Sequence, residues 1–206
     1  MLGEVRAPPL DRPAPSEVQA PDVSDIEISD GAPVDNLLSE KHRRLLTEPL
    51  YTSWEGPPER DEGRRPFLAA SDVGLFATPR EPPLVPDVFV SLDVRPHPDI
   101  QKEKRHQTYF FWEFGKPPDI VIEIVSNTRG DELGRKKRGY ARMRVLYYVV
   151  WDPCGFLGEP ALHCFELRGD LYVPLATPWF EAAALGLSLW QGQFEHEPGE
   201  WLRWCR

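Results

Sequence analysis

The chain has 206 residues and a formal net charge of −9, and 41% of its residues are hydrophobic. That composition suffices for one domain with a real core. No run of 18 apolar residues occurs and the N-terminus lacks an apolar signal core, so we expect neither a membrane span nor secretion.

The three cysteines are odd in number and show no paired spacing, and the five histidines are scattered. We therefore expect reduced thiols, no zinc site and a cytoplasmic location.

Residues 1–36 are rich in proline and acid and poor in aromatic residues. They hold eight acidic and two basic residues, a net −6, which leaves −3 for the rest of the chain. Such a segment cannot bury enough apolar surface to order itself. We predict a disordered tail over residues 1–36 and a single domain over residues 37–206.

The first elements of the domain are predicted from capping and β-branched patterns. A short helix is expected over residues 40–48 and is expected to end at Pro49. A strand is expected over residues 67–78, and another over residues 88–92. Asp87 stands directly before that second strand.

The central stretch, residues 117–152, reads as strand, polar turn, basic helix and strand. Residues 120–125 form a nearly continuous β-branched run, interrupted only by Glu123, which predicts a strand covered on both faces. The helix is expected over residues 131–143 and the second strand over residues 145–151. Such a crossover predicts parallel strands and an α/β class.

Further strands are predicted toward the C-terminus. A β-hairpin is expected to turn at Arg168-Gly169-Asp170. Two groups of aromatic residues offer apolar surface beyond one small core. They are the aromatic residues of 109–114 and the C-terminal tryptophans Trp190, Trp201 and Trp204. This surface predicts a homodimer.

Two acidic residues on neighbouring strands, Asp87 and Glu123, are followed by lysines on the next helix. Two carboxylates and a backbone carbonyl are hard oxygen ligands that suit Mg²⁺, or Mn²⁺. A lysine beside the metal can orient a water and stabilise developing charge. This set serves phosphodiester hydrolysis, although Asp, Glu and Lys near strand ends are common in α/β proteins.

The chain resembles the Uma-two family of endonucleases in the string LVPDVFVSL and, after a polar insertion, in PPDIVIEIVSNTRGDELGRKKRGYARMRVLYYVVWDP. The resemblance covers about residues 38–206 and is dense from residue 67 to residue 153. The family lies in the restriction-endonuclease-like PD-(D/E)XK superfamily. The resemblance implies a core of mixed β-sheet flanked by helices, here with a C-terminal β-hairpin, and a Mg²⁺ site at the sheet edge.

The resemblance also implies roles for particular residues. Asp87 matches the aspartate of the family's Pro-Asp motif, and Glu123 matches the acidic residue of its second motif. With the backbone carbonyl of Ile124 they would hold the metal. The superfamily usually has lysine where this chain has Val125, and within the family the following helix supplies it, which matches Lys136.

Several other residues are candidates for supporting roles. The helical geometry excludes neither Lys136 nor Lys137. Glu40 could approach the metal from the first helix, or be a plain first-turn acid. Asp119 shares strand parity with Glu123 but lies about 13 Å from it, at roughly 3.3 Å per residue.

The segment from residue 129 to residue 144 has seven basic and two acidic residues, a net +5. Such a helix face either contacts phosphates or is simply solvated. We predict that it binds nucleic acid, DNA in the main hypothesis, through Arg129, Arg135, Arg138 and Arg142. The sequence therefore predicts a Mg²⁺-dependent DNA endonuclease; the alternative is a nuclease-fold module that binds nucleic acid or a protein partner and cuts nothing.

Overall fold

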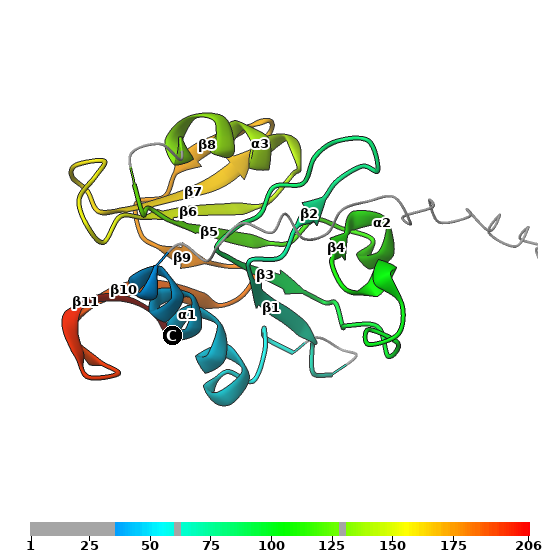
Figure 1. Cartoon of the computed structure of the whole chain (residues 1–206), viewed down its shortest axis with the longest axis horizontal. Helices are drawn as coiled ribbons and strands as arrows, with labels where there is room; N and C mark the ends of the chain where they lie inside the picture. Colours follow the sequence, from blue (N-terminus) through cyan, green and yellow to red (C-terminus); the bar gives the residue numbers. More distant parts are fainter. Residues whose placement is uncertain (1–35, 60–62, 128–130) are drawn as a thin grey trace, which may run out of the picture.

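The computed structural model of the chain describes residues 36–59, 63–127 and 131–206 (Figure 1). The predicted disordered tail and the predicted nucleic-acid contact Arg129 lie outside these residues, apart from Asn36. Of the helices in the described ranges, none has the length and apolar composition needed to cross a membrane.

A six-stranded mixed sheet forms the centre of the fold. β5 and β6 are parallel, and the other neighbouring pairs are antiparallel. Every residue of β3, β5 and β6 is buried, as the β-branched run predicts for a sheet covered on both faces. The α/β class is thus confirmed. The strand order is β1 (Phe67–Ser71), β3 (Val88–Leu92), β5 (Ile120–Ile124), β6 (Tyr147–Trp151), β7 (Leu162–Arg168) and β8 (Leu171–Pro174).

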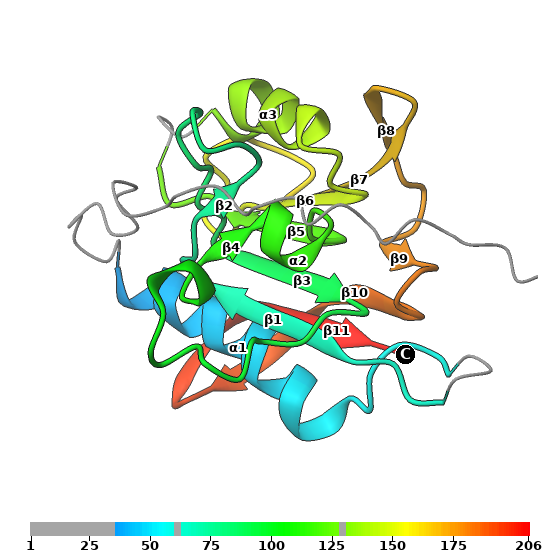
Figure 2. The same ribbon diagram turned by 90° about the vertical axis from the view of Figure 1, so that its right-hand side faces the viewer.

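One face of this sheet is covered by the first helix and by a small C-terminal sheet (Figures 1 and 2). Helix α1 (Leu37–Ser53) begins at Asn36, whose side chain accepts a hydrogen bond from the Ser39 N–H. Trp204 Nε1 donates to the Leu46 carbonyl at 2.8 Å and ties the helix to the small sheet. That sheet has the order β11 (Glu197–Cys205), β10 (Leu185–Phe194) and β9 (Trp179–Phe180).

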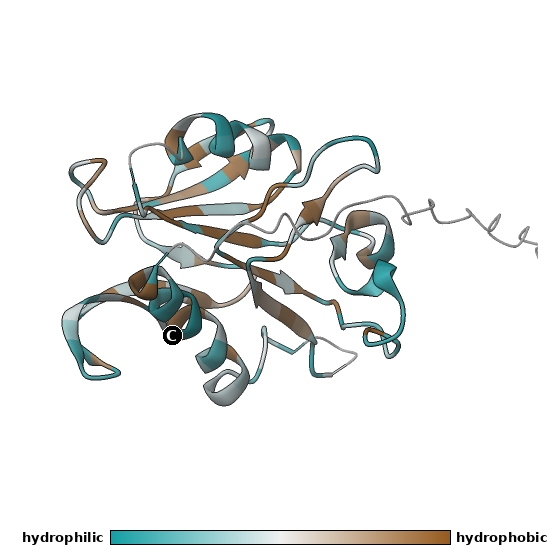
Figure 3. Cartoon of the chain, in the orientation of Figure 1, coloured by the Kyte–Doolittle hydropathy of each residue, from teal (hydrophilic) through white to brown (hydrophobic). Residues whose placement is uncertain are grey.

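The other face is covered by the basic helix and by a parallel pair of short strands. The buried rings of Tyr140 and Tyr148 pack here, with centroids 5.2 Å apart. Hydrophobic residues concentrate in the strands of the large sheet (Figure 3). The covering elements are η2 (Glu132–Lys136), α3 (Lys137–Arg142), β2 (Leu75–Phe76), β4 (Tyr109–Phe110), α2 (Phe111–Phe114) and η1 (Lys104–His106).

The predicted end of the first helix at Pro49 is wrong, because α1 continues through this proline to Ser53. Proline removes one N–H donor from the last turns, and packing offsets that loss. Leu46 and Leu50 are buried, and the Tyr51 hydroxyl both donates to the Ala69 carbonyl and accepts from its N–H, each at 2.8 Å.

The predicted strand over residues 67–78 is also wrong, because it divides into β1 and β2, which belong to different sheets. The break lies at Asp72, whose φ of 55° is left-handed. The Asp72 N–H donates a hydrogen bond to the carbonyl of Pro86, the residue directly before Asp87, at 3.2 Å. This bond holds the turn close to Asp87.

The predicted helix over residues 131–143 begins as a single π-helical turn, η2, before it becomes α3. Asp131 caps it with a left-handed φ of 53° and accepts a hydrogen bond from the Arg135 N–H. Leu133 is 39% exposed, whereas Glu132 is buried. The wider turn changes the helical phase, so Glu132 and Lys136 point toward the sheet instead.

Of the eight aromatic residues expected to offer apolar surface, three are buried and five are partly buried. Tyr109, Phe110 and Trp201 are each at most 1% exposed. The homodimer remains a prediction, but these residues do not supply a surface for it.

His42 on α1 provides a test of this packing. Its ring lies 4.8 Å from the Trp201 ring and 6.0 Å from the Trp151 ring, and neither of its nitrogens has a hydrogen-bond partner among the described residues. Burial lowers the pKa of His42 to about 4. The unfolded chain therefore binds a proton near pH 6.5 that the folded chain takes up only near pH 4.

Stability should consequently fall as the pH drops through this window. We expect His42 to remove about 2 kcal/mol from the free energy of unfolding between pH 7 and pH 5. Urea unfolding at the two pH values should show a smaller pH dependence for His42→Phe than for the unsubstituted chain. Equal pH dependence of the two proteins would contradict the buried neutral imidazole.

Candidate active site

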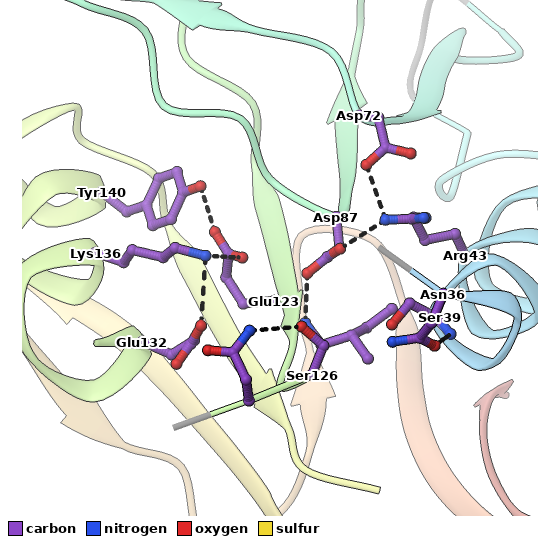
Figure 4. A network of polar contacts seen from close by, with 12 residues as sticks. Asn36, Ser39, Arg43, Asp72, Asp87, Glu123, Ser126, Glu132, Lys136 and Tyr140 are labelled. Carbon is purple, nitrogen blue, oxygen red and sulfur yellow. Dashed lines mark hydrogen bonds and ion pairs between the residues drawn. The ribbon is translucent and has the colours of Figure 1, made fainter. Parts of the chain in front are cut away.

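The two predicted acidic residues meet at one end of the large sheet (Figure 4). β3 and β5 are antiparallel with Val88 opposite Ile122, and the same register places Asp87 opposite Glu123. Residues directly opposite one another in an antiparallel pair present their side chains on the same face. The sheet itself therefore brings together two carboxylates that are 36 residues apart in the sequence.

Asp87 is held by one backbone group and one cation. Its Oδ2 accepts a hydrogen bond from the Ile124 N–H at 2.7 Å, and its Oδ1 accepts one from Arg43 Nη1 at 3.1 Å. Arg43 reaches the site from α1 and is 4% exposed, and the same Nη1 donates to Asp72 Oδ1 at 3.0 Å. Burial raises the pKa of Asp87, although the Ile124 N–H and the charges of Lys136 and Arg43 oppose this.

Glu123 is the more deeply buried of the two, at 1% exposure. Its Oε1 accepts a hydrogen bond from the Tyr140 hydroxyl at 2.6 Å, and its Oε2 accepts one from Lys136 Nζ at 2.8 Å. Burial raises the pKa of Glu123 to about 8; the charge of Asp87 adds to this, whereas Lys136 and Tyr140 oppose it. A carboxylate in this position is costly unless positive charge compensates it.

Lys136 lies between two acidic side chains. Besides Glu123 it contacts Glu132, with 3.5 Å between Lys136 Nζ and Glu132 Oε1. Burial acts to lower the pKa of Lys136, but the charges of Glu123, Glu132 and Asp87 together raise it. The π-helical turn places Glu132 and Lys136 on the same side of the chain, so the lysine remains a charged donor beside the carboxylates.

The site contains oxygen atoms of the kind that a divalent cation takes as ligands. Two opposed carboxylates provide hard oxygen atoms, and with every group ionised the site has four acids and two cations, a net −2. A Mg²⁺ ion would neutralise that charge and would keep water among its ligands. Within the described ranges no three or more His, Cys, Asp and Glu residues are grouped to hold a metal. The acids are Asp72, Asp87, Glu123 and Glu132, and the cations are Arg43 and Lys136.

Other candidate residues are engaged elsewhere. Asp119 Oδ2 accepts a hydrogen bond from the Leu92 N–H at 2.7 Å and pairs with Lys116, at the beginning of β5. Glu40 pairs with Arg44 on α1 at 2.6 Å. Lys137 Nζ lies 3.4 Å from the centre of the Phe165 ring.

The structure therefore distinguishes the two lysines that helical geometry alone left open. Lys136 contacts Glu123 and Lys137 does not. The predicted nucleic-acid contacts that fall in the described ranges, Arg135, Arg138 and Arg142, are exposed on η2 and α3.

Four residues of the site were not predicted from the sequence: Glu132, Tyr140, Arg43 and Asp72. Glu132 and Tyr140 stand four residues before and after Lys136, a spacing that places side chains on one helical face. That spacing could have identified them. No sequence spacing could have identified Arg43 or its contact with Asp72, because both depend on how α1 packs across the end of the sheet.

A model of the Uma2 family, described as "putative restriction endonuclease", matches residues 17–191. The chain belongs to the Uma2 family. The matched region contains every residue of the site, and the mixed sheet agrees with the restriction-endonuclease-like fold that the resemblance implied. No curated protein was found to match the chain.

Replacing Asp119 tests whether this acidic residue of the Uma2 protein stabilises the fold and has no part in cation binding. Replacing it by alanine leaves the N–H of buried Leu92 without its acceptor, which costs about 1–3 kcal/mol. We expect Asp119→Ala to unfold at lower urea concentration and to titrate with Mn²⁺ as the unsubstituted chain does. Unchanged stability, or lost cation binding, would contradict the structural role.

Proposed function

We propose that this Uma2 protein hydrolyses phosphodiester bonds of DNA in a reaction that depends on Mg²⁺ or Mn²⁺. The observation that carries the proposal is the meeting of Asp87 and Glu123 across β3 and β5, with Lys136 Nζ 2.8 Å from the glutamate. The family's description as a restriction endonuclease supports the same reaction class.

Asp87, Glu123 and the Ile124 carbonyl would hold the cation. When bound, the cation supplies Lewis-acid stabilisation of the charge that develops on a phosphate. Tyr140 and Arg43 orient the two carboxylates through the hydrogen bonds that each donates. The Ile124 N–H fixes the second oxygen of Asp87.

Lys136 is the residue of this chain best placed to handle the attacking water. Its charged ammonium can donate a hydrogen bond to that water or to a phosphate oxygen beside the carboxylates. Glu132 keeps the side chain directed toward Glu123. Lys136 thus combines positioning of the nucleophile with stabilisation of negative charge.

The carboxylates can be tested by substitutions that keep their shape. We expect Asp87→Asn and Glu123→Gln each to abolish the calorimetric heat of Mn²⁺ binding and any nicking of plasmid DNA, because each removes a ligand charge. The exposed Glu48 on α1 serves as a matched control, and Glu48→Gln should behave as the unsubstituted chain does. An unsubstituted chain that binds neither Mg²⁺ nor Mn²⁺ at low salt would favour the binding module that cuts nothing.

Lys136 should separate cation binding from cleavage. Lys136→Met removes the donor beside the site but neither metal-binding carboxylate. We expect at least a hundredfold loss of cleavage rate, about the contribution of one positioned electrostatic donor, with Mn²⁺ binding retained. Lys102, whose side chain is 78% exposed, gives the control Lys102→Met. Cleavage that persists in Lys136→Met would remove this residue from the proposed mechanism.

A further inference from the structure

A groove lies between the basic helix and the edge strand β8, on the other side of η2 from the carboxylates. Its volume is about 750 Å³. One wall comes from η2 and α3 and the other from the end of the β7–β8 hairpin, and both views show these elements beside one another (Figures 1 and 2). The residues on which the argument depends are Arg135, Arg138, Arg142, Leu133, Leu171 and Tyr172.

The helical wall is strongly cationic. Five basic side chains line the groove against one acid, Asp170, a net +4, although the whole chain carries −9. Asp170 is already paired with Arg144 at 2.7 Å. Arg135, Arg138 and Arg142 are exposed and form no ion pair with any residue in the described ranges. Such a wall favours an anionic ligand that carries several charges in a row.

The groove also has apolar side chains that face solvent, on both of its walls. On β8 Leu171 is 74% exposed, and on η2 Leu133 is 39% exposed beside the arginines. Tyr172 follows Leu171 on β8, and its hydroxyl donates to the Val145 carbonyl, so that the ring is fixed. A ligand that made only charge contacts would leave this apolar surface uncovered.

We propose that this groove binds single-stranded nucleic acid, with phosphates on the arginines and bases against Leu133, Leu171 and Tyr172. A single strand exposes the faces of its bases, which can pack on apolar and aromatic side chains while the backbone follows a cationic surface. A duplex hides those faces in its stack, so it can use only the arginine wall. The ligand must therefore carry regularly spaced negative charge and free flat apolar surfaces.

The groove and the carboxylate site share one helical turn. On that turn Lys136 points to Glu123. Its neighbour Lys137 lines the groove and lies over the Phe165 ring. A nucleic-acid strand bound in the groove is therefore held one helical turn from the candidate active site. This inference rests on the proposed function for its biological sense, but binding in the groove needs no cation and no cleavage.

The test compares short fluorescent DNAs of the same sequence, one single-stranded and one duplex, by anisotropy in EDTA over a series of salt concentrations. We expect the single strand to bind more tightly. Arg138→Ala/Arg142→Ala should weaken binding and reduce the slope of log K against log salt by about 1.4, because each phosphate contact on a single strand contributes roughly 0.7. The control Lys102→Ala/Arg105→Ala makes the same charge change at exposed residues in and just before η1, outside the groove.

The apolar wall requires its own variant. Leu171→Ser removes an exposed side chain, and we expect severalfold weaker single-strand binding with an unchanged salt slope, since no charge is lost. Leu189→Ser on β10 is the matched control, because Leu189 is 43% exposed and lies outside the groove. Melting curves of all variants show whether each has folded.

Three results would overturn the inference: duplex bound as tightly as the single strand, full affinity retained in the arginine or Leu171 variant, or binding only of an acidic peptide with the sequence of residues 1–36. Each of these three results can be distinguished from a failure of the proposed function. Cation titration and plasmid nicking report on Asp87 and Glu123, so a protein that cuts duplex DNA but binds no single strand keeps the first proposal and loses this one.

Discussion

A buried carboxylate, that of Glu123, is the constraint on which the site depends. It lies near the end of β5, an inner strand of the sheet whose other residues are apolar, where an ionised group loses the hydration that stabilises it in water. Lys136 and Tyr140 each bond one of its oxygens, yet burial still raises its pKa to about 8. The chain thus has a group that is costly to bury in a strand whose other residues are apolar.

Neighbouring features compensate for that carboxylate. The π-helical turn directs Glu132 and Lys136 toward it, and a Cβ at Gly134 would come within 2.0 Å of the Asp131 carboxylate that caps this turn. Helix α1 continues through Pro49, and its Arg43 reaches around the end of the sheet to Asp87. Helices on both faces of the sheet therefore contribute one cation each to the same cluster.

Much of this arrangement was predictable from local sequence. The β-branched run identified β5, the crossover length predicted its parallel pairing with β6, and Asp87 and Glu123 fell at the ends of adjacent strands. Their pairing follows from the sheet register, and the identity of the lysine came from the family resemblance. These strand predictions are confirmed because periodicity and strand parity are local properties of the chain.

What could not be predicted depends on tertiary packing. The left-handed turn at Asp72 and the π-helical turn at Asp131 each need a positive φ at a non-glycine residue, which no periodicity shows. The contact between Arg43 and Asp87 joins residues 44 positions apart through the docking of α1. The burial of Tyr109 and Trp201, taken from composition as surface, likewise depends on elements distant in the sequence.

The central claim is that Glu123 is kept for a cation and not for stability. Thermal melting of the unsubstituted chain and of Glu123→Gln, in EDTA and in excess Mn²⁺, tests it most directly. Glutamine keeps the shape and removes the buried charge, and Lys136, which is 27% exposed, retains Glu132 as a partner. In EDTA the variant should melt at the same temperature or higher, and Mn²⁺ should stabilise only the unsubstituted chain. A clear drop in the melting temperature of Glu123→Gln in EDTA, of the size expected when a buried ion pair is broken (about 3–5 kcal/mol), would show that Glu123 is structural and would contradict the account.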